Sequence, residues 1–250
     1  MAKYGSPSTF LLIDGYNLTG DSFEMATDKE TLPLIETQGF GDSWIEQTAP
    51  GVYRGTLDHK TFYDDDALAS NVALVTQMGT GRVLLAGVEG NTQGKKAIGM
   101  TAMQVNYQRT VARADLHRVA AKYMTTGALD EAKIVQILAA QTSNGAGSSG
   151  ALDNAASSAN GGVAYLEVTA VTLSGYTSIS VTLQESSDNG VGDAWATVVG
   201  CAFTTATART AQRVEVAAGV TVERYLRALV TLVGTGTSPS ITYTVAFARN

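Results

Sequence analysis

The densest cluster of residues that could do chemistry is Asp58-His59, followed closely by Asp64-Asp65-Asp66. Carboxylates and imidazoles are ligands for divalent cations, so one interpretation is a metal site. The alternative is structural, because aspartates ahead of an amphipathic helix cap its first turn and interact well with the positive end of its dipole. Capping accounts for these residues, and we therefore predict no bound metal.

Two glycine-containing segments match parts of nucleotide-binding motifs. Residues 145–150 (GAGSSG) have the spacing of the dinucleotide fingerprint, which functions only as the turn from a buried strand into a helix. No alternating strand and helix pattern surrounds them. Gly94-Lys95 matches the end of a phosphate loop, but Glu89 stands at the first glycine position and Lys96 replaces the magnesium-binding hydroxyl residue. We predict no cofactor.

Nucleophilic catalysis has little support in the residues. The two histidines are His59 and His117, and no Gly-x-Ser-x-Gly elbow is present. The single cysteine, Cys201, lies in the apolar run VVGCAF, which predicts a small buried side chain and leaves no internal disulfide. We expect a protein that is not an enzyme.

The charge balance argues against binding of nucleic acid through phosphate neutralisation. The net charge is −6, and residues 1–140 carry 12 basic and 16 acidic side chains while residues 141–250 carry 5 and 7. An acidic surface repels a polyanion. The chain opens without an apolar targeting segment and has no long apolar run, so we expect a soluble protein made in a cytoplasm.

A low-complexity segment divides the chain. Residues 141–162 are almost wholly Gly, Ala, Ser, Asn and Thr, a composition that predicts a flexible linker. All seven lysines precede it, and the part after it is rich in Thr, Val and Ala. We predict an assembly domain over residues 1–140 and an accessory domain over residues 163–250.

The first block predicts a hairpin, a long loop and paired strands. Asp14-Gly15 lies between two short apolar stretches, as in a tight β-hairpin. Residues 21–41 have no clear period and predict an extended loop. Strands are expected over residues 44–48 and 52–62, joined by a turn at Pro50-Gly51.

One helix is expected next, over residues 65–78, because apolar residues recur there at helical spacing and Gly79 supplies a stop. Its expected apolar stripe consists of Leu68, Val72, Val75 and Met78. Strands follow over residues 82–88 and 98–110. Residues 115–140 satisfy both a helical and an alternating period, and both interpretations stay open.

The second block alternates apolar and polar residues with a period of two. Such runs indicate half-buried antiparallel strands, and several of them predict an immunoglobulin-like β-sandwich with Leu226 in its core. The aromatic residues of this block either line a glycan-binding face or fill the sandwich core. They are Tyr176, Trp195, Tyr225 and Tyr243.

The order of these elements gives the first block a resemblance. A hairpin, a long loop, paired strands, one helix and further strands over residues 8–140 resemble the layout of a major tail tube protein of a long-tailed, siphovirus-like bacteriophage. The second block is similar to sandwich domains fused to phage virion proteins. Residues 183–188 (LQESSD) with Trp195, residues 223–228 (ERYLRA) and the final strand 243–250 carry that similarity.

The resemblance implies a mainly β structural protein of the phage tail. Its copies would form hexameric rings that stack into a tube for DNA passage, with other tail proteins as partners and the sandwich decorating the exterior. DNA would be a passing cargo, and no membrane would be involved. The long loop would reach an adjacent subunit.

Two other functions stay open, a capsid decoration protein and a glycan-binding module acting through the second block. Large aromatic residues on loop-rich segments often anchor protein contacts. Phe40, Trp44 and Tyr53 are therefore our candidates for an assembly interface, although each could equally be a core residue.

Overall fold

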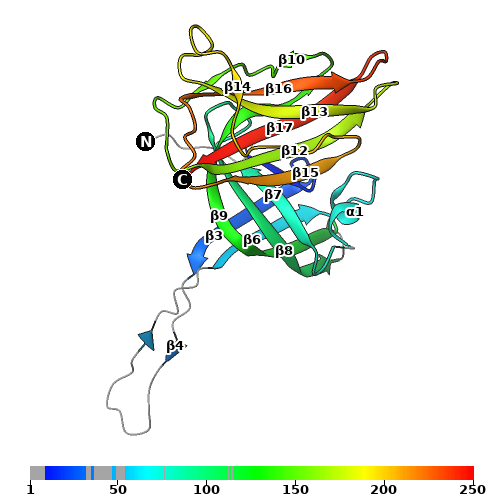
Figure 1. Ribbon diagram of the computed structural model, residues 1–250. Coiled ribbons are helices and arrows are strands. Elements are labelled where there is room, and N and C mark those ends of the chain that lie inside the picture. Colours follow the sequence, from blue (N-terminus) through cyan, green and yellow to red (C-terminus); the bar gives the residue numbers. More distant parts are fainter. Residues whose placement is uncertain are drawn as a thin grey trace.

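The fold is mainly β and antiparallel (Figure 1). The structure is a computed structural model that describes residues 9–31, 35–36, 47–48, 54–75, 77–111, 113 and 115–250. Within those residues it has one short helix, α1 (Ser70–Leu74). No helix in that part of the chain has the length and apolar character needed to cross a membrane.

A ten-stranded antiparallel sheet forms the frame of the molecule. Its order is β15-β12-β17-β9-β8-β7-β1-β2, with β6 paired to β9 and β3 paired to β6. Strands from both halves of the sequence therefore belong to one sheet. The strands are β1 (Phe10–Ile13), β2 (Tyr16–Asn17), β3 (Ser22–Thr31), β6 (Arg54–Phe62), β7 (Gly81–Gly87), β8 (Lys96–Thr110), β9 (Arg118–Gln141), β12 (Gly162–Thr172), β15 (Thr210–Val216) and β17 (Ser240–Arg249).

Two smaller sheets complete the strand inventory of the described residues. A five-stranded sheet has the order β10-β16-β13-β14, with β11 also on β16, and β4 pairs with β5. The five-stranded sheet consists of β10 (Gly145–Ala146), β11 (Leu152–Asp153), β13 (Ser178–Ser186), β14 (Ala196–Thr197) and β16 (Tyr225–Val233). The two-stranded sheet consists of β4 (Ile35–Glu36) and β5 (Gln47–Thr48).

Strand β9 settles the ambiguity of residues 115–140. It is 24 residues long and pairs with β6 over residues 118–124, with β8 over residues 118–133 and with β17 over residues 133–141. Val119, Ala121 and Tyr123 alternate toward the core and are almost fully buried. The segment is a strand because the face that carries these three residues packs against β1, β7 and α1.

Three apolar clusters fill the interior. The first lies between the two large sheets and contains Leu166 of β12, Val181 of β13 and Leu226 of β16, so Leu226 is a core residue as expected. The second lies under α1 and the lower strands, around Leu57 and Met100. The third lies on the face of the ten-stranded sheet opposite the first cluster. The sheet curls, so that β1 and β12 both line this core. The first and third clusters contain residues from both halves of the chain, so apolar packing joins the two blocks.

The predicted helix over residues 65–78 is wrong in extent. Leu68, Val75 and Met78 are exposed, so the expected stripe does not face the core as a unit. Hydrogen bonds around the aspartates replace the first helical turn, since Asp66 N–H donates to the Asp64 side chain. At the other end Met78 forms a parallel bridge to Gln104 of β8.

The loop expected over residues 21–41 is also wrong in its first half, which forms β3. Strand β3 pairs with β6, with Met25 opposite His59 and Thr27 opposite Leu57. Register shifts interrupt this ladder near both ends of β3, which explains why no clean period of two is visible in the sequence. The expected pairing of residues 44–48 with 52–62 is likewise not the one observed, because β5 pairs with β4.

The low-complexity segment 141–162 lies against β16. Gly147 N–H donates to the Ala228 carbonyl, and Leu152 is 8% exposed within the first cluster. The Gln136 side chain of β9 also bonds to Ser148. Backbone pairing thus holds a segment with little apolar surface of its own. Its role as a boundary between domains 1–140 and 163–250 stays a prediction.

Candidate assembly surfaces

The lower part of the large sheet is a four-stranded sheet with two free edges, in the order β3-β6-β9-β8. Among the described residues β3 pairs only with β6. The outer edge of β8 beyond Gln104 has no strand partner among the described residues, because the pairing of β7 with β8 ends at Met103. Free strand edges present unpaired N–H and C=O groups and readily bind another strand.

The two faces of this four-stranded sheet differ in chemistry. One face packs on the second cluster through Leu57, Ala121 and Tyr123. The opposite face is polar and carries two ion pairs, Lys60–Glu24 at 2.7 Å and Lys122–Asp58 at 3.5 Å. Each of the four side chains is about half exposed, so these pairs contribute little to folding stability.

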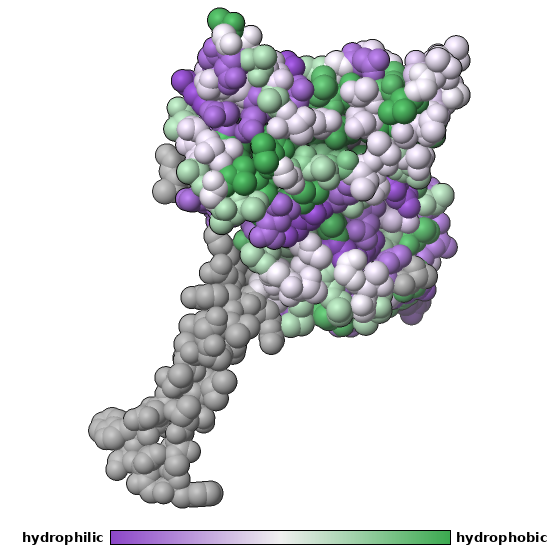
Figure 2. All heavy atoms as spheres, in the orientation of Figure 1, coloured by the Kyte–Doolittle hydropathy of each residue, from purple (hydrophilic) through white to green (hydrophobic). Residues whose placement is uncertain are grey.

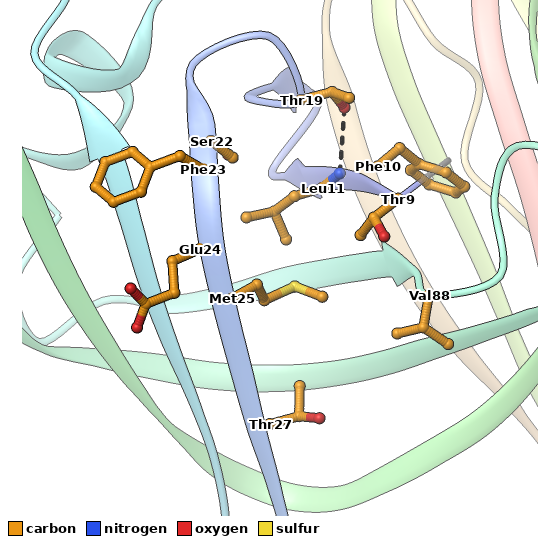
Figure 3. A pocket seen from close by; sticks show the side chains of 10 residues that line it. All are labelled: Thr9, Phe10, Leu11, Thr19, Ser22, Phe23, Glu24, Met25, Thr27 and Val88. Atoms are coloured by element: carbon orange, nitrogen blue, oxygen red, sulfur yellow. Dashed lines mark hydrogen bonds between the residues drawn. The ribbon is translucent and has the colours of Figure 1, made fainter. Parts of the chain in front are cut away.

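A groove of about 460 Å³ lies beside the free edge of β3. Figure 3 shows Met25 and Thr27 on the groove side of β3, with Leu11, Phe10 and Val88 across from them. Phe10 and Leu11 are buried and form its floor, and Leu11 N–H bonds to the Thr19 hydroxyl at 3.2 Å. The groove is therefore lined by apolar residues together with hydroxyl-bearing residues and Glu24.

Exposed apolar side chains gather beside the free edge of β8. Val75 and Met78, which follow α1, are 36% and 53% exposed. Met103 and Val105 of β8 are 37% and 38% exposed. Met78 is bridged to Gln104, which lies between Met103 and Val105 in the strand, and we call these four exposed residues the β8 patch. Exposed apolar residues beside a free strand edge are candidates for an interaction site.

The proposed interface residues Phe40, Trp44 and Tyr53 lie outside the described residues, so the structure does not test them. Around them, β3 and β6 form a long hairpin, and β4 lies beyond its end and away from the body in Figure 1.

The residues considered for a metal site do not form one. His59 is 1% exposed, its Nε2 lies 2.7 Å from the Ser22 hydroxyl, and burial lowers the pKa of His59 to about 4. Asp65 accepts a hydrogen bond from Asn71. No group of three or more His, Cys, Asp and Glu side chains suited to a metal occurs among the described residues.

The remaining candidates have structural positions. Residues 145–150 contain β10, a strand paired with β16, and do not begin a helix. Cys201 is 2% exposed in the first cluster, and burial raises its pKa to about 12. Tyr243 is fully buried, while the Trp195 ring is partly exposed with the Arg227 guanidinium 4.1 Å from its centre.

A buried polar centre joins the first hairpin to the body, and sequence reasoning missed it. Arg82 of β7 is 1% exposed. Its Nε donates to the Asp14 carboxylate at 2.6 Å, and its Nη1 donates to the Ala73 carbonyl at 2.8 Å. Asp14 also accepts a hydrogen bond from Val83 N–H at 3.0 Å. The ion pair therefore anchors the turn at residues 14–15 to β7.

Glu167 of β12 completes this centre from the second half of the chain. Its Oε2 accepts a hydrogen bond from Gly15 N–H at 2.6 Å, and its Oε1 is buried without a hydrogen-bond partner among the described residues. Burial raises the pKa of Glu167 well above its usual range, and the neighbouring Asp14 adds to this. The Gly15 hydrogen bond and Arg82 act in the opposite direction. The Gly15 hydrogen bond and Arg82 thus offset only part of the effect of burial on the pKa of Glu167.

The turn itself requires glycine. Asp14 and Gly15 both have positive φ, 48° and 76°, as in the tight hairpin turn expected from the Asp-Gly pair. A Cβ on Gly15 would lie 2.5 Å from the Val168 carbonyl oxygen, so the turn sits directly against β12.

A second polar cluster lies where β9, β12 and β15 meet. The Tyr165 hydroxyl donates to the Asp130 carboxylate, and Arg213 Nη2 lies 3.1 Å from the same oxygen. Burial, with Asp130 adding to it, raises the pKa of Tyr165. Figure 2 shows a hydrophilic band across the middle of the body at the level of β15. This cluster is satisfied and structural.

Comparison with known proteins gives distant structural neighbours. A scan against protein-family models and a search of curated proteins gave no match. A chain from the tail of an empty gene transfer agent particle, refined with C6 symmetry, is 11% identical with a TM-score of 0.36, covering 52% of this chain and 98% of its own. A chain from the virion of the native particle has 11% identity, a TM-score of 0.38 and the same coverage.

The third neighbour spans nearly the whole chain. It is the Dit protein of phage SPP1, described as a paradigm of the hub adsorption apparatus in phages that infect Gram-positive bacteria. It is 10% identical with a TM-score of 0.37, covering 96% of this chain and 98% of its own. At these TM-scores none of the three carries an argument about what this chain does.

Proposed function

We propose that this chain is a structural subunit of a phage tail that assembles with further copies of itself. The observation that carries the proposal is the pair of free edges, on β3 and β8, at the two sides of one four-stranded sheet. Natural proteins usually cover long strand edges, and an edge left open is suited to pairing with another chain. The opening hairpin, the single helix and the further strands, which remain of the layout that resembles a tail tube protein, favour the same role.

The two edges suit a head-to-tail contact. Each neighbouring pair within the four-stranded sheet is antiparallel, so β3 and β8 run in opposite directions. Edge β3 of one copy can thus pair with edge β8 of the next as a further antiparallel ladder. A contact between two different surfaces, repeated by rotation, generates a closed ring, and the sheets then form one continuous barrel without edges.

Six copies per ring, stacking into a tube and passage of DNA through it are parts of the proposal that come from the resemblance. The acidic net charge of −6 fits a DNA cargo that passes without adhering. The partners would be other tail proteins, and the location the virion, after assembly in the host cytoplasm. No catalytic or cofactor role is part of the proposal.

Two further regions have roles in this proposal. The β3–β6 hairpin and its continuation toward β4 would reach an adjacent copy, with Phe40, Trp44 and Tyr53 as candidate contacts. Residues 163–250 would decorate the exterior. Within that block, Tyr243 is buried and Arg227 lies over the Trp195 ring, while Tyr176 and Tyr225 are partly exposed.

Negative-stain electron microscopy of the full chain, concentrated stepwise, tests the proposal. We expect rings or striated tubes with a central hole. Uniform single particles at every concentration would contradict self-assembly. Empty phage heads would then be the next binding partner to test, since specific binding to them would favour a capsid decoration protein.

A further inference from the structure

The register of the four-stranded sheet aligns the groove beside β3 with the β8 patch. Thr27 lies opposite Leu57, and Leu57 lies opposite Tyr123. Tyr123 in turn lies opposite Gln104, which is the residue bridged to Met78. One row of residues therefore runs straight across the sheet, from the groove at one edge to Met78 at the other.

The free portions of the two edges are also level with each other. Glu24 lies in the row of Lys60, Ala120 and Gln108, and Ala26 lies in the row of Asp58, Lys122 and Asn106. The free part of β8 thus begins just beyond Met78 and spans the rows of Ser22 to Ala26, because Arg109 lies in the row of Val119, Thr61 and Ser22. The Met78 segment already occupies the β8 edge in the next row, that of Thr27.

The two surfaces match in chemistry. The groove has an apolar floor of Phe10 and Leu11, with Met25 and Thr27 on its β3 side (Figure 3). The β8 patch presents Met78, an unbranched and adaptable side chain that is 53% exposed. A volume of about 460 Å³ lies within the range of sites that enclose a small ligand, ~300–1,000 Å³.

We infer that Met78 of one copy inserts into the groove between β1 and β3 of the next copy, with Val75 covering its mouth. The inference rests on the proposed head-to-tail pairing of β3 with β8, without a stagger along the strands. The occupant of the groove is a second copy of this chain.

Because the contact joins two different surfaces, each can be blocked separately. Met78→Glu places a charge on the inserting side chain, and Thr27→Glu places one in the groove. Each variant alone keeps one working surface but has no partner for it, so we expect monomers at concentrations at which the unmodified chain assembles. A 1:1 mixture has one matched pair of surfaces and is expected to form dimers that grow no further.

Analytical ultracentrifugation measures these species, and thermal melting checks that each variant is folded. The matched controls are Val191→Glu, at a position 88% exposed on the β13–β14 loop, and Thr197→Glu on the exposed β14. Both controls are expected to assemble like the unmodified chain, and the two blocked variants to associate at least tenfold more weakly.

The outcomes separate this inference from the proposed function. If the unmodified chain assembles and the Met78 and Thr27 variants assemble equally well, the insertion is wrong while the tail proposal survives. Folded variants that stay monomeric even when mixed would also overturn the insertion, because they would indicate a contact without two separable surfaces. An unmodified chain that never associates would overturn both.

Discussion

The upper and lower parts of the molecule use the same strand β9 in opposite ways. In the upper part, β9, β12 and β17 face the β13–β16 sheet, and the first apolar cluster is enclosed between them. In the lower part, β9 lies within a four-stranded sheet that has a core on one face only. Among the described residues, that sheet has a polar face, two free edges and a groove beside β3. The upper part therefore encloses its core between two sheets, and the lower part covers its core with one face of a single sheet.

Under the proposed function, this difference would place folding stability and assembly in separate regions. Burial of apolar area is the main stabilising contribution to folding, and it is concentrated where sheets cover each other. Groups at open edges contribute little to the isolated chain and gain their interactions on association. Substitutions in the two regions should therefore change different measurements.

The largest expected effect on stability is in the enclosed core of the upper part. Leu226→Ala removes a side chain that is 1% exposed and should lower the free energy of unfolding by about 2–5 kcal/mol, from lost burial and the cavity left behind. Urea unfolding measures this, and assembly below the melting temperature should be unchanged. Loss of rings in a fully folded Leu226→Ala variant would break the proposed separation.

The next effect is at the polar centre that connects the hairpin to the body. Arg82→Met keeps much of the apolar stem but removes the partner of Asp14. We expect the free energy of unfolding to fall by about 3 kcal/mol, which is at the lower end for a broken buried pair. The effect is at the lower end because the Asp14 side chain is 34% exposed. The double variant Arg82→Met/Asp14→Asn should recover part of the loss. A single variant as stable as the unmodified chain would mean that the pair does not anchor the hairpin.

Glu167 gives a pH-dependent effect of intermediate size. Its pKa is raised in the folded state, so its stabilising contribution is fully present below its ordinary pKa of 4.5 and declines as pH rises toward the raised value. The slope is at most about 1.4 kcal/mol per pH unit. Glu167→Gln cannot ionise, and its stability relative to the unmodified chain should grow from pH 5 to pH 8 in urea unfolding. Parallel stability curves would contradict a raised pKa of Glu167 in the folded chain.

The smallest effect is on the polar face of the lower sheet. Lys60→Met removes an ion pair in which both side chains are about half exposed, and we expect a change in stability below about 1 kcal/mol. Thermal melting at low and high salt measures it. A loss of several kcal/mol would show that this face supports folding, and the contrast between the two parts would then disappear.

The strands of the second block could be predicted because their ladders follow a simple period. The alternating runs containing Val168, Val181, Leu226 and Val245 correspond to β12, β13, β16 and β17. Each has one face in the enclosed core, so the apolar period appears directly in the sequence. The Asp14-Gly15 hairpin was also predictable, since its turn chemistry is local.

The misjudged elements depend on contacts distant in sequence. Strand β3 pairs with β6 through shifted registers, so no local period marks it. The end of the expected helix at Met78 instead bridges β8, which satisfies backbone groups that a longer helix would have used. Glu167 falls on the polar positions of its alternating run, but both faces of β12 are covered, and this burial is visible only in the folded chain.

The candidate assembly surfaces were hardest to foresee, because a free edge is defined by the strand that fails to pair with it. The sequence singled out aromatic residues at positions 40, 44 and 53. The structure instead draws attention to Met78 and Thr27, at opposite edges of one sheet. The only sequence signal for this surface was the apolar character of Val75 and Met78 at the end of the expected helical stripe. Such a stripe is typical of a face that packs on a core.

Strand β9 has a mechanical consequence. Its 24 residues correspond to roughly 80 Å of chain contour, and the strand passes from the lower sheet into the upper one without a break (Figure 1). Turning one part against the other would require bending this strand and shearing its ladders to β8 and β17 together. In an assembly of copies joined through the lower sheet, the upper part of every copy would therefore have the same orientation relative to the lower part. The outermost loops of the upper parts would then repeat with the same spacing and pitch as the assembly itself.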